Sequence, residues 1–169
     1  MLQLYPAQPL WPDFVVLAAG SVALELAGRP ICYRNGQLLP AETLTATAQD
    51  SLDVPEARIG DYVGLFLMRL LEATTGLARV MGSDEQLACF GDNPACLALR
   101  RAGNRIRVAY RESPRGPDIA AAYPVERDLR ATVAAAVDEY VAQLLALNPA
   151  LAGQPDMMRL RAGQRQLED

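Results

Sequence analysis

Short apolar stretches with β-strand patterning come first along the chain. FVVLAA is continuously apolar, and in SVALEL apolar residues alternate with Ser21, Ala23 and Glu25, which is typical of a half-buried strand. ICYRNGQLLP follows, with Asn35-Gly36 between two apolar runs. Because type I′ turns need positive φ at both central positions, this dipeptide predicts a β-hairpin.

A helical period follows these strands. Asp53 as N-cap, Pro55 in the first turn and Glu56 three residues after the cap form a capping box. Apolar residues then recur at helical spacing as far as Leu77. The pattern predicts one long helix from Asp53 to Leu77, apolar on more than one side and therefore central to the fold.

Three strands of a meander come next, in QLACF, CLALRR and RIRVAYRE, with turns at GDNP and at residues 102–104. Apolar and basic residues alternate along the third strand. The apolar set is Ile106, Val108 and Tyr110, and the basic set is Arg105, Arg107 and Arg111. Since successive side chains of a strand point to opposite faces, the arginines are expected together on the face away from the core.

A second long helix is predicted from Pro124 to about Leu147, where Asn148-Pro149 ends it. The polar tail after Gly153 is expected to fray beyond one or two weak helical turns. Together these elements predict an α+β fold: a mostly antiparallel sheet with two long helices packed on one face.

Length and composition indicate one domain. The chain has 169 residues, about half of them apolar, which is enough for one substantial core. Prolines at positions 6, 9 and 12 predict an extended arm over residues 1–12. Residues 13–152 are then expected to form a single α+β domain, and residues 153–169 the polar tail.

The chain contains no lysine and no histidine, so all sixteen of its basic residues are arginine. This excludes histidine bases, histidine metal ligands and lysine Schiff bases. No G-x-G-x-x-G occurs, and the carboxylates of Asp84-Glu85 and Asp138-Glu139 diverge because they are adjacent in sequence. We therefore expect no enzymatic activity, no cofactor and no bound metal.

Three cysteines, Cys32, Cys89 and Cys96, form no C-x-x-C motif and are expected to be buried free thiols. A bridge between Cys89 and Cys96 across a hairpin is the alternative. Neither a signal peptide nor a membrane anchor is recognisable, and a reduced, cytoplasmic protein is the simpler interpretation.

Six arginines fall within RRAGNRIRVAYRESPRG, although the formal net charge of the chain is -4. Three interpretations are open: pairing with carboxylates of neighbouring strands, docking of a protein partner, and binding of nucleic acid. The last is disfavoured, because the sequence pI is about 4.9 and Tyr110 is predicted on the opposite face. If the arginine face is exposed, Arg105→Ala and Arg107→Ala change stability by no more than about 0.5 kcal/mol.

The stretch CLALRRAGNRIRVAYRES, followed after a loop by YPVERDLRATVAAAVDEYVAQLLALNP, resembles the C-terminal half of small bacterial immunity proteins. These belong to polymorphic toxin systems and to type VI or contact-dependent secretion systems. The likeness covers roughly residues 86–149. It implies a non-enzymatic cytoplasmic toxin inhibitor that binds one cognate toxin and occludes its active site.

Acidic immunity proteins often meet basic toxins, so the resemblance makes Asp84, Glu85 and Asp92 candidate contacts. Asp92 could equally only form the turn. Arg105, Arg107 and Arg111 are the further partner-binding candidates. A secretion chaperone or adaptor for an effector protein is the alternative function. Either way the expected partner is a protein, not nucleic acid or a membrane, and the choice between monomer and dimer is open.

Overall fold

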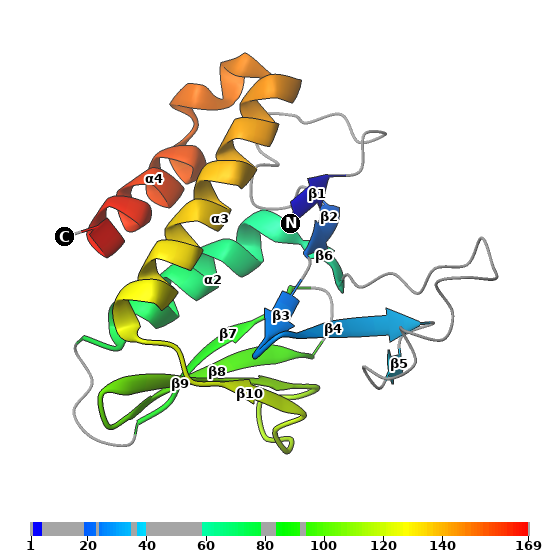
Figure 1. Ribbon diagram of the computed structural model, residues 1–169. Coiled ribbons are helices and arrows are strands. Elements are labelled where there is room, and N and C mark those ends of the chain that lie inside the picture. Colours follow the sequence, from blue (N-terminus) through cyan, green and yellow to red (C-terminus); the bar gives the residue numbers. More distant parts are fainter. Residues whose placement is uncertain are drawn as a thin grey trace.

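The computed structural model consists of a four-stranded antiparallel sheet and three helices, together with short N-terminal strands (Figure 1). It describes residues 2–4, 19–22, 24–34, 37–39, 59–78, 84–91 and 94–168. This confirms the predicted α+β class.

The central sheet has the strand order β10-β9-β8-β7. The strands are β7 (Gln86–Cys89), β8 (Cys96–Ala102), β9 (Arg105–Arg111) and β10 (Ala120–Ala122). Ala102 pairs with Arg105, so Gly103 and Asn104 form a two-residue turn, and Gly103 has the positive φ of 63° that glycine adopts without strain. The predicted meander is confirmed, and the edge strand β10 adds to it.

Two helices cover one face of this sheet, which we call the inner face. α2 (Val63–Gly76) contacts β7 and β8, and α3 (Glu126–Leu147) contacts β9. The 3₁₀ helix η2 (Pro149–Gly153) then leads to α4 (Pro155–Glu168), which packs against α2 and α3 (Figure 1). None of the described helices is both long and apolar enough to span a bilayer.

The core fills the space between the inner face and the helices. Ile106, Val108 and Tyr110 are at most 4% exposed, which confirms their predicted face. The rings of Phe66 on α2 and Phe90 after β7 stack with centroids 4.2 Å apart. Other fully enclosed side chains are Leu67, Leu77, Leu99, Tyr140, Leu144, Leu151, Met157 and Leu160.

The N-terminal part contributes two small three-stranded sheets. β2 (Ala19–Val22) lies between β1 (Leu2–Leu4) and β6 (Ile59–Tyr62). β4 (Arg29–Arg34) lies between β3 (Leu24–Leu26) and β5 (Gln37–Leu39). Apart from Ala19, the predicted strand FVVLAA lies outside the described residues, as do residues 5–12 of the predicted arm.

Strand pairing confirms the predicted hairpin. Arg34 pairs with Gln37, which leaves Asn35 and Gly36 as the connection between β4 and β5. These two residues themselves lie outside the described ranges. The register therefore supports the turn position that the Asn-Gly dipeptide predicts.

The predicted start of the first long helix was wrong. Residues Ile59–Tyr62 form a strand that pairs with β2, and α2 begins only at Val63. An apolar run with few polar residues is compatible with a helix or with a strand. Pairing with β2 provides hydrogen-bond partners for the backbone of residues 59–62, so these residues need no helix. The proposed capping box at Asp53, Pro55 and Glu56 lies outside the described residues.

The predicted fraying of the polar tail was also wrong, because residues 155–168 form α4. Its mean composition is polar, but Met157, Leu160, Gln164 and Leu167 recur at helical spacing and are buried. A Cβ added to Gly163 would lie 3.1 Å from Leu71 Cδ1, which shows how closely α4 approaches α2. A narrow apolar stripe is sufficient to stabilise α4 because α2 and α3 provide an apolar surface against which it packs.

Candidate functional site

The sheet face turned away from the helices, here called the outer face, collects most of the residues predicted to bind a partner. Directly paired residues point to the same side, so the register assigns them. The bridge between Arg105 and Val125 continues the β9–β10 register beyond β10 and places Tyr123 beside Arg107. The outer face comprises Glu85, Leu87, Cys89, Cys96, Ala98, Arg100, Ala102, Arg105, Arg107, Ala109, Arg111, Ile119, Ala121, Tyr123 and Val125.

Two arginines and two carboxylates form an ion-pair cluster across this face. Arg111 binds Glu85 through both terminal nitrogens, at 2.6 and 2.9 Å, and donates from Nε to Asp118 at 2.7 Å. Arg107 pairs with Asp118, and its Nη1 lies 3.8 Å from Glu85. Glu85 precedes β7 and Asp118 precedes β10, so the cluster ties the two edges of the sheet to β9.

The cluster is partly buried. The side chains of Arg107 and Arg111 are only 12% and 14% exposed. Ala98 and Ala109 lie between the two arginines in the register and are fully buried. Long arginine side chains over small residues cover apolar surface with their methylene groups while the charged ends remain paired.

The arginines predicted to bind a partner therefore differ from one another. Arg105 is exposed and donates a 2.7 Å hydrogen bond to the carbonyl of Tyr123. The expectation that Arg107 is an exposed residue of little structural weight was wrong, because carboxylates from both sides hold it against the sheet. Of the three interpretations of the arginines, pairing with carboxylates applies to Arg107 and Arg111. Their partners, Glu85 and Asp118, lie next to the neighbouring strands β7 and β10.

The acidic candidates Asp84 and Glu85 differ in whether their charge is paired within the chain. Asp84 is exposed, beside Glu85. Both oxygens of Glu85 already accept hydrogen bonds from Arg111, so its charge is compensated within the chain. Asp92 lies outside the described residues.

Four large apolar side chains on or beside the outer face were missed by the sequence analysis. They are Leu87 at 39%, Ile119 at 43%, Tyr123 at 51% and Val125 at 42% exposure. Of the described residues, the other large exposed apolar side chains are Leu147 and Met158, both on helices. The short continuous apolar run IAAAYPV could have signalled a strand, but it has no apolar–polar alternation and follows directly after the SPRGPD loop.

The charge of the outer face is opposite in sign to that of the whole chain. Arg100, Arg105, Arg107 and Arg111 outnumber the carboxylates of Glu85 and Asp118 by two, whereas the chain has a formal net charge of -4. Counting the neighbouring Asp84 leaves the face positive. Complementary charge on a docked surface would therefore be negative.

Two free cysteines stand opposite each other at one corner of the outer face. Cys89 pairs in register with Cys96, and Cys96 pairs with Arg111 on its other side. The pKa of the Cys96 thiol is raised to about 11, mainly by burial and in addition by the neighbouring Cys89, while Arg111 opposes the rise. The expectation of a buried thiol fits Cys96, whereas Cys89 is half-buried.

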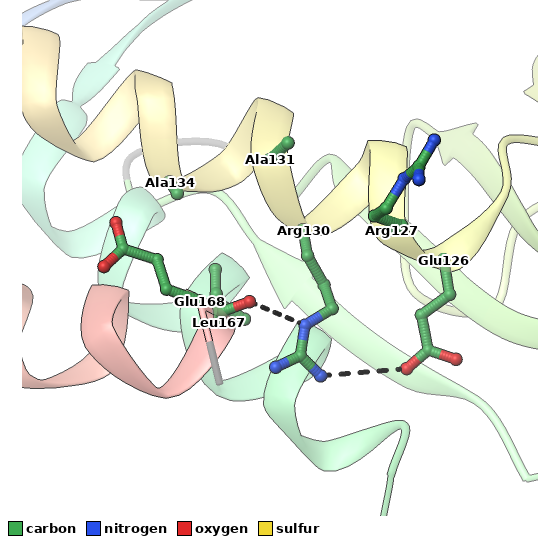
Figure 2. Close-up of a pocket in the computed structure, with 7 residues that line it drawn as sticks. All are labelled: Glu126, Arg127, Arg130, Ala131, Ala134, Leu167 and Glu168. Carbon is green, nitrogen blue, oxygen red and sulfur yellow. Dashed lines mark hydrogen bonds and ion pairs between the residues drawn. The ribbon is translucent and has the colours of Figure 1, made fainter.

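A second feature is a hollow of about 520 Å³ between α3 and the end of α4 (Figure 2). Arg130 reaches across it and donates from Nε to the carbonyl of Leu167 at 2.8 Å and from Nη2 to that of Gln166 at 2.7 Å. Its Nη1 also lies 4.0 Å from Glu126. Since these bonds satisfy carbonyls at the end of α4, Arg130 joins the two helices rather than forming an open anion site.

A smaller pocket of about 290 Å³ lies among β2, β3, α2, α3 and β8. Its walls are mostly aliphatic, with Thr132 and Glu139 as the polar residues. Thr132 donates its hydroxyl proton to the carbonyl of Asp128 within α3. This pocket offers burial for an apolar group.

Within the described part of the chain, no group of three or more cysteine, aspartate or glutamate residues is placed to hold a metal ion. Asp138 and Glu139 are both exposed on α3. Of the surfaces formed by the described residues, the outer face brings together the most charged and exposed apolar side chains, and it is the candidate site. Comparisons of the chain with models of protein families, with curated proteins and with solved structures gave no match.

Proposed function

We propose that this chain is a non-enzymatic binding protein whose outer face docks a protein partner, most concretely an immunity protein that occludes the active site of a cognate secreted toxin. The observation that carries the proposal is the composition of that face. Exposed apolar side chains, one of them tyrosine, surround arginines that are already held in place.

This composition is typical of the centre of protein interfaces, where tyrosine and arginine contribute much of the binding energy. Ordering a long side chain on binding costs about 0.5–1.5 kcal/mol. The carboxylates of Glu85 and Asp118 already hold Arg107 and Arg111, so most of this cost falls on folding instead. A twisted sheet also presents these groups on a rigid support.

The positive charge of the outer face also bears on the partner. The docked surface is expected to carry carboxylates, so that Arg100 and Arg105 gain partners while the cluster remains paired internally. This reverses the expectation that acidic residues of this chain contact a basic toxin. An acidic active site is the kind of toxin surface that such a face would cover.

Affinity capture from the native cell tests the proposal, with the wild-type chain and two variants as baits. Tyr123→Asp places a charge on the outer face, and the matched control Met158→Asp changes a residue of similar exposure, 54%, on α4. The wild type and the control are expected to retain the same secreted protein, and Tyr123→Asp to lose it. Co-expression with that protein should protect cells only when the complex forms.

Three outcomes would contradict the proposal. Equal capture by both variants would move the interface away from the outer face. A stable complex without protection would remove the immunity function. A dimer of this chain holding an extended, unfolded cargo, seen by light scattering and proteolysis of the complex, would favour the chaperone or adaptor function instead.

A further inference from the structure

Cys89 and Cys96 occupy a pairing position that suits a disulfide. Cys89 ends β7, Cys96 begins β8, and the two are directly opposite. The next pair along the ladder is hydrogen-bonded, because Phe90 N–H donates to the Ala95 carbonyl at 2.9 Å. Hydrogen-bonded and non-hydrogen-bonded pairs alternate in antiparallel sheets, so Cys89 and Cys96 form a non-hydrogen-bonded pair.

Such a pair brings its Cα atoms to about 4.5 Å, within the range of about 4.4–6.8 Å that disulfides span. Both side chains lie on the outer face, and both thiols are free. Side chains of a directly opposed, non-hydrogen-bonded pair lie close together on one face of the sheet, so the register places the two thiols side by side. Closing the bond requires a rotation of side chains and no change in strand register.

The two cysteines differ in access. Cys89 is half-buried, whereas Cys96 is fully buried. A small oxidant can therefore reach Cys89 directly, whereas Cys96 exposes no surface to it. This is the arrangement of an attacking thiol and a resolving thiol.

We propose that Cys89 and Cys96 form a reversible disulfide by exchange with a low-molecular-weight disulfide, R–S–S–R. Cys89 gives up its proton and attacks one sulfur of R–S–S–R, forming a mixed disulfide and releasing one thiolate R–S⁻. Cys96 then gives up its proton and attacks Cys89 Sγ, which breaks the bond to the R group and releases the second thiolate. The two protons go to the released thiolates, so the dithiol is oxidised by two electrons and R–S–S–R is reduced to two R–SH.

The bond would join the ends of β7 and β8 across the 90–95 connection, beside Arg111 and the ion-pair cluster. Oxidation constrains mainly the unfolded chain, because the folded backbone already has the required register. Formation of this bond does not depend on the proposed partner.

The experiment uses the full, reduced chain in native buffer with glutathione disulfide, followed by peptide mapping and thiol counting. The expected product is one disulfide between Cys89 and Cys96, with Cys32 still titrating as a free thiol and the denaturation midpoint raised. Dithiothreitol should restore three thiols. Cys32→Ser is the matched control and should form the same bridge.

Cys96→Ser should stop the reaction at a mixed disulfide on Cys89, and Cys89→Ser should leave Cys96 unmodified under native conditions. If either serine variant fails to fold, mapping of the wild type and of Cys32→Ser decides the matter alone. Bridging that involves Cys32, bridging that appears only in denaturant, or native protein that keeps Cys89 and Cys96 unlinked would overturn the proposal.

Discussion

Arg105 and Arg107 lie on the same face of β9 but differ in burial, and this difference determines what each substitution costs. Arg107→Ala would remove one of the two arginine partners of Asp118 and would expose Ala98 and Ala109 to solvent. We expect it to lower the free energy of unfolding by about 2 kcal/mol, below the range for fully buried pairs because water still reaches the cluster. Arg105→Ala removes one exposed hydrogen bond and should cost no more than about 0.5 kcal/mol.

Urea denaturation of the two variants, fitted with a common slope, checks this prediction. If Arg107→Ala lowered the free energy of unfolding as little as Arg105→Ala, the ion-pair cluster would contribute nothing to folding. The pairing across the outer face would then be incidental.

A second prediction at the residue scale concerns alkaline pH. The folded-state pKa of Cys96 is raised from 9.0 to about 11, so the unfolded chain releases this proton first. Stability from the neutral thiol is therefore complete below pH 9 and is lost as pH rises from 9 to 11, by up to about 3 kcal/mol. Cys96→Ala should flatten this decline.

Tyr140 provides the control for the alkaline series. Burial raises the pKa of its phenol, and a hydrogen bond with the Gly64 backbone opposes this rise. The contribution of the neutral phenol to the free energy of unfolding is therefore lost only above pH 10.0. Tyr140→Phe should therefore keep the decline between pH 9 and 10 that Cys96→Ala removes. Denaturant midpoints measured at half-unit pH steps distinguish the two, and an identical slope in all three proteins would refute the assignment to Cys96.

At the scale of elements, arginine side chains satisfy carbonyl groups where helices and strands end. Arg101 donates to Leu77 at the end of α2 and pairs with Glu126 at the start of α3. Arg69 donates to the carbonyls of Cys89 and Phe90 at the end of β7. In a chain without lysine, the branched guanidinium can bind two acceptors at once and so link elements that are distant in sequence.

The third prediction tests whether α4 is an integral part of the structure. Leu160 is fully buried beneath α2 and α3, so Leu160→Ala should cost about 2–5 kcal/mol through lost burial and a cavity. Met158, two residues earlier, is 54% exposed, and Met158→Ala should cost no more than about 0.5 kcal/mol. Thermal and urea unfolding check both; a small cost for Leu160→Ala would mean that α4 is only loosely attached.

At the scale of the whole molecule, charge is unevenly distributed. The net charge of the chain is negative, but the outer face is positive. Long-range steering follows the local field near the contact more than the total charge, and salt screens it within about 8–10 Å. The proposed interface should therefore respond to charge changes on this face and not to equal changes elsewhere.

The fourth prediction uses that distinction. With the captured partner, Arg105→Glu should slow association by roughly fivefold at low ionic strength, and the effect should shrink as salt is added. Arg159→Glu, on the exposed side of α4 at 71% exposure, makes the same change in total charge and should leave the association rate nearly unchanged. Stopped-flow mixing measures both, and faster binding by Arg105→Glu would mean that the partner surface is basic.

Local periodicity was sufficient to predict the meander, the hairpin around residues 35 and 36, the second long helix and the inward placement of Ile106, Val108 and Tyr110. These features depend on alternation, turn chemistry and helical spacing, which act over a few residues. The absence of lysine and histidine likewise excluded whole classes of chemistry from the sequence alone.

The other features depend on contacts between elements that are distant in the sequence. Residues 59–62 became a strand because β2 supplies hydrogen-bonding partners, and residues 155–168 became a helix because α2 and α3 supply an apolar surface. The burial of Arg107, its carboxylate partners and the exposed apolar residues beside it depend on which strands are neighbours in the sheet. Those energies come from contacts between residues far apart in sequence, which no local pattern encodes.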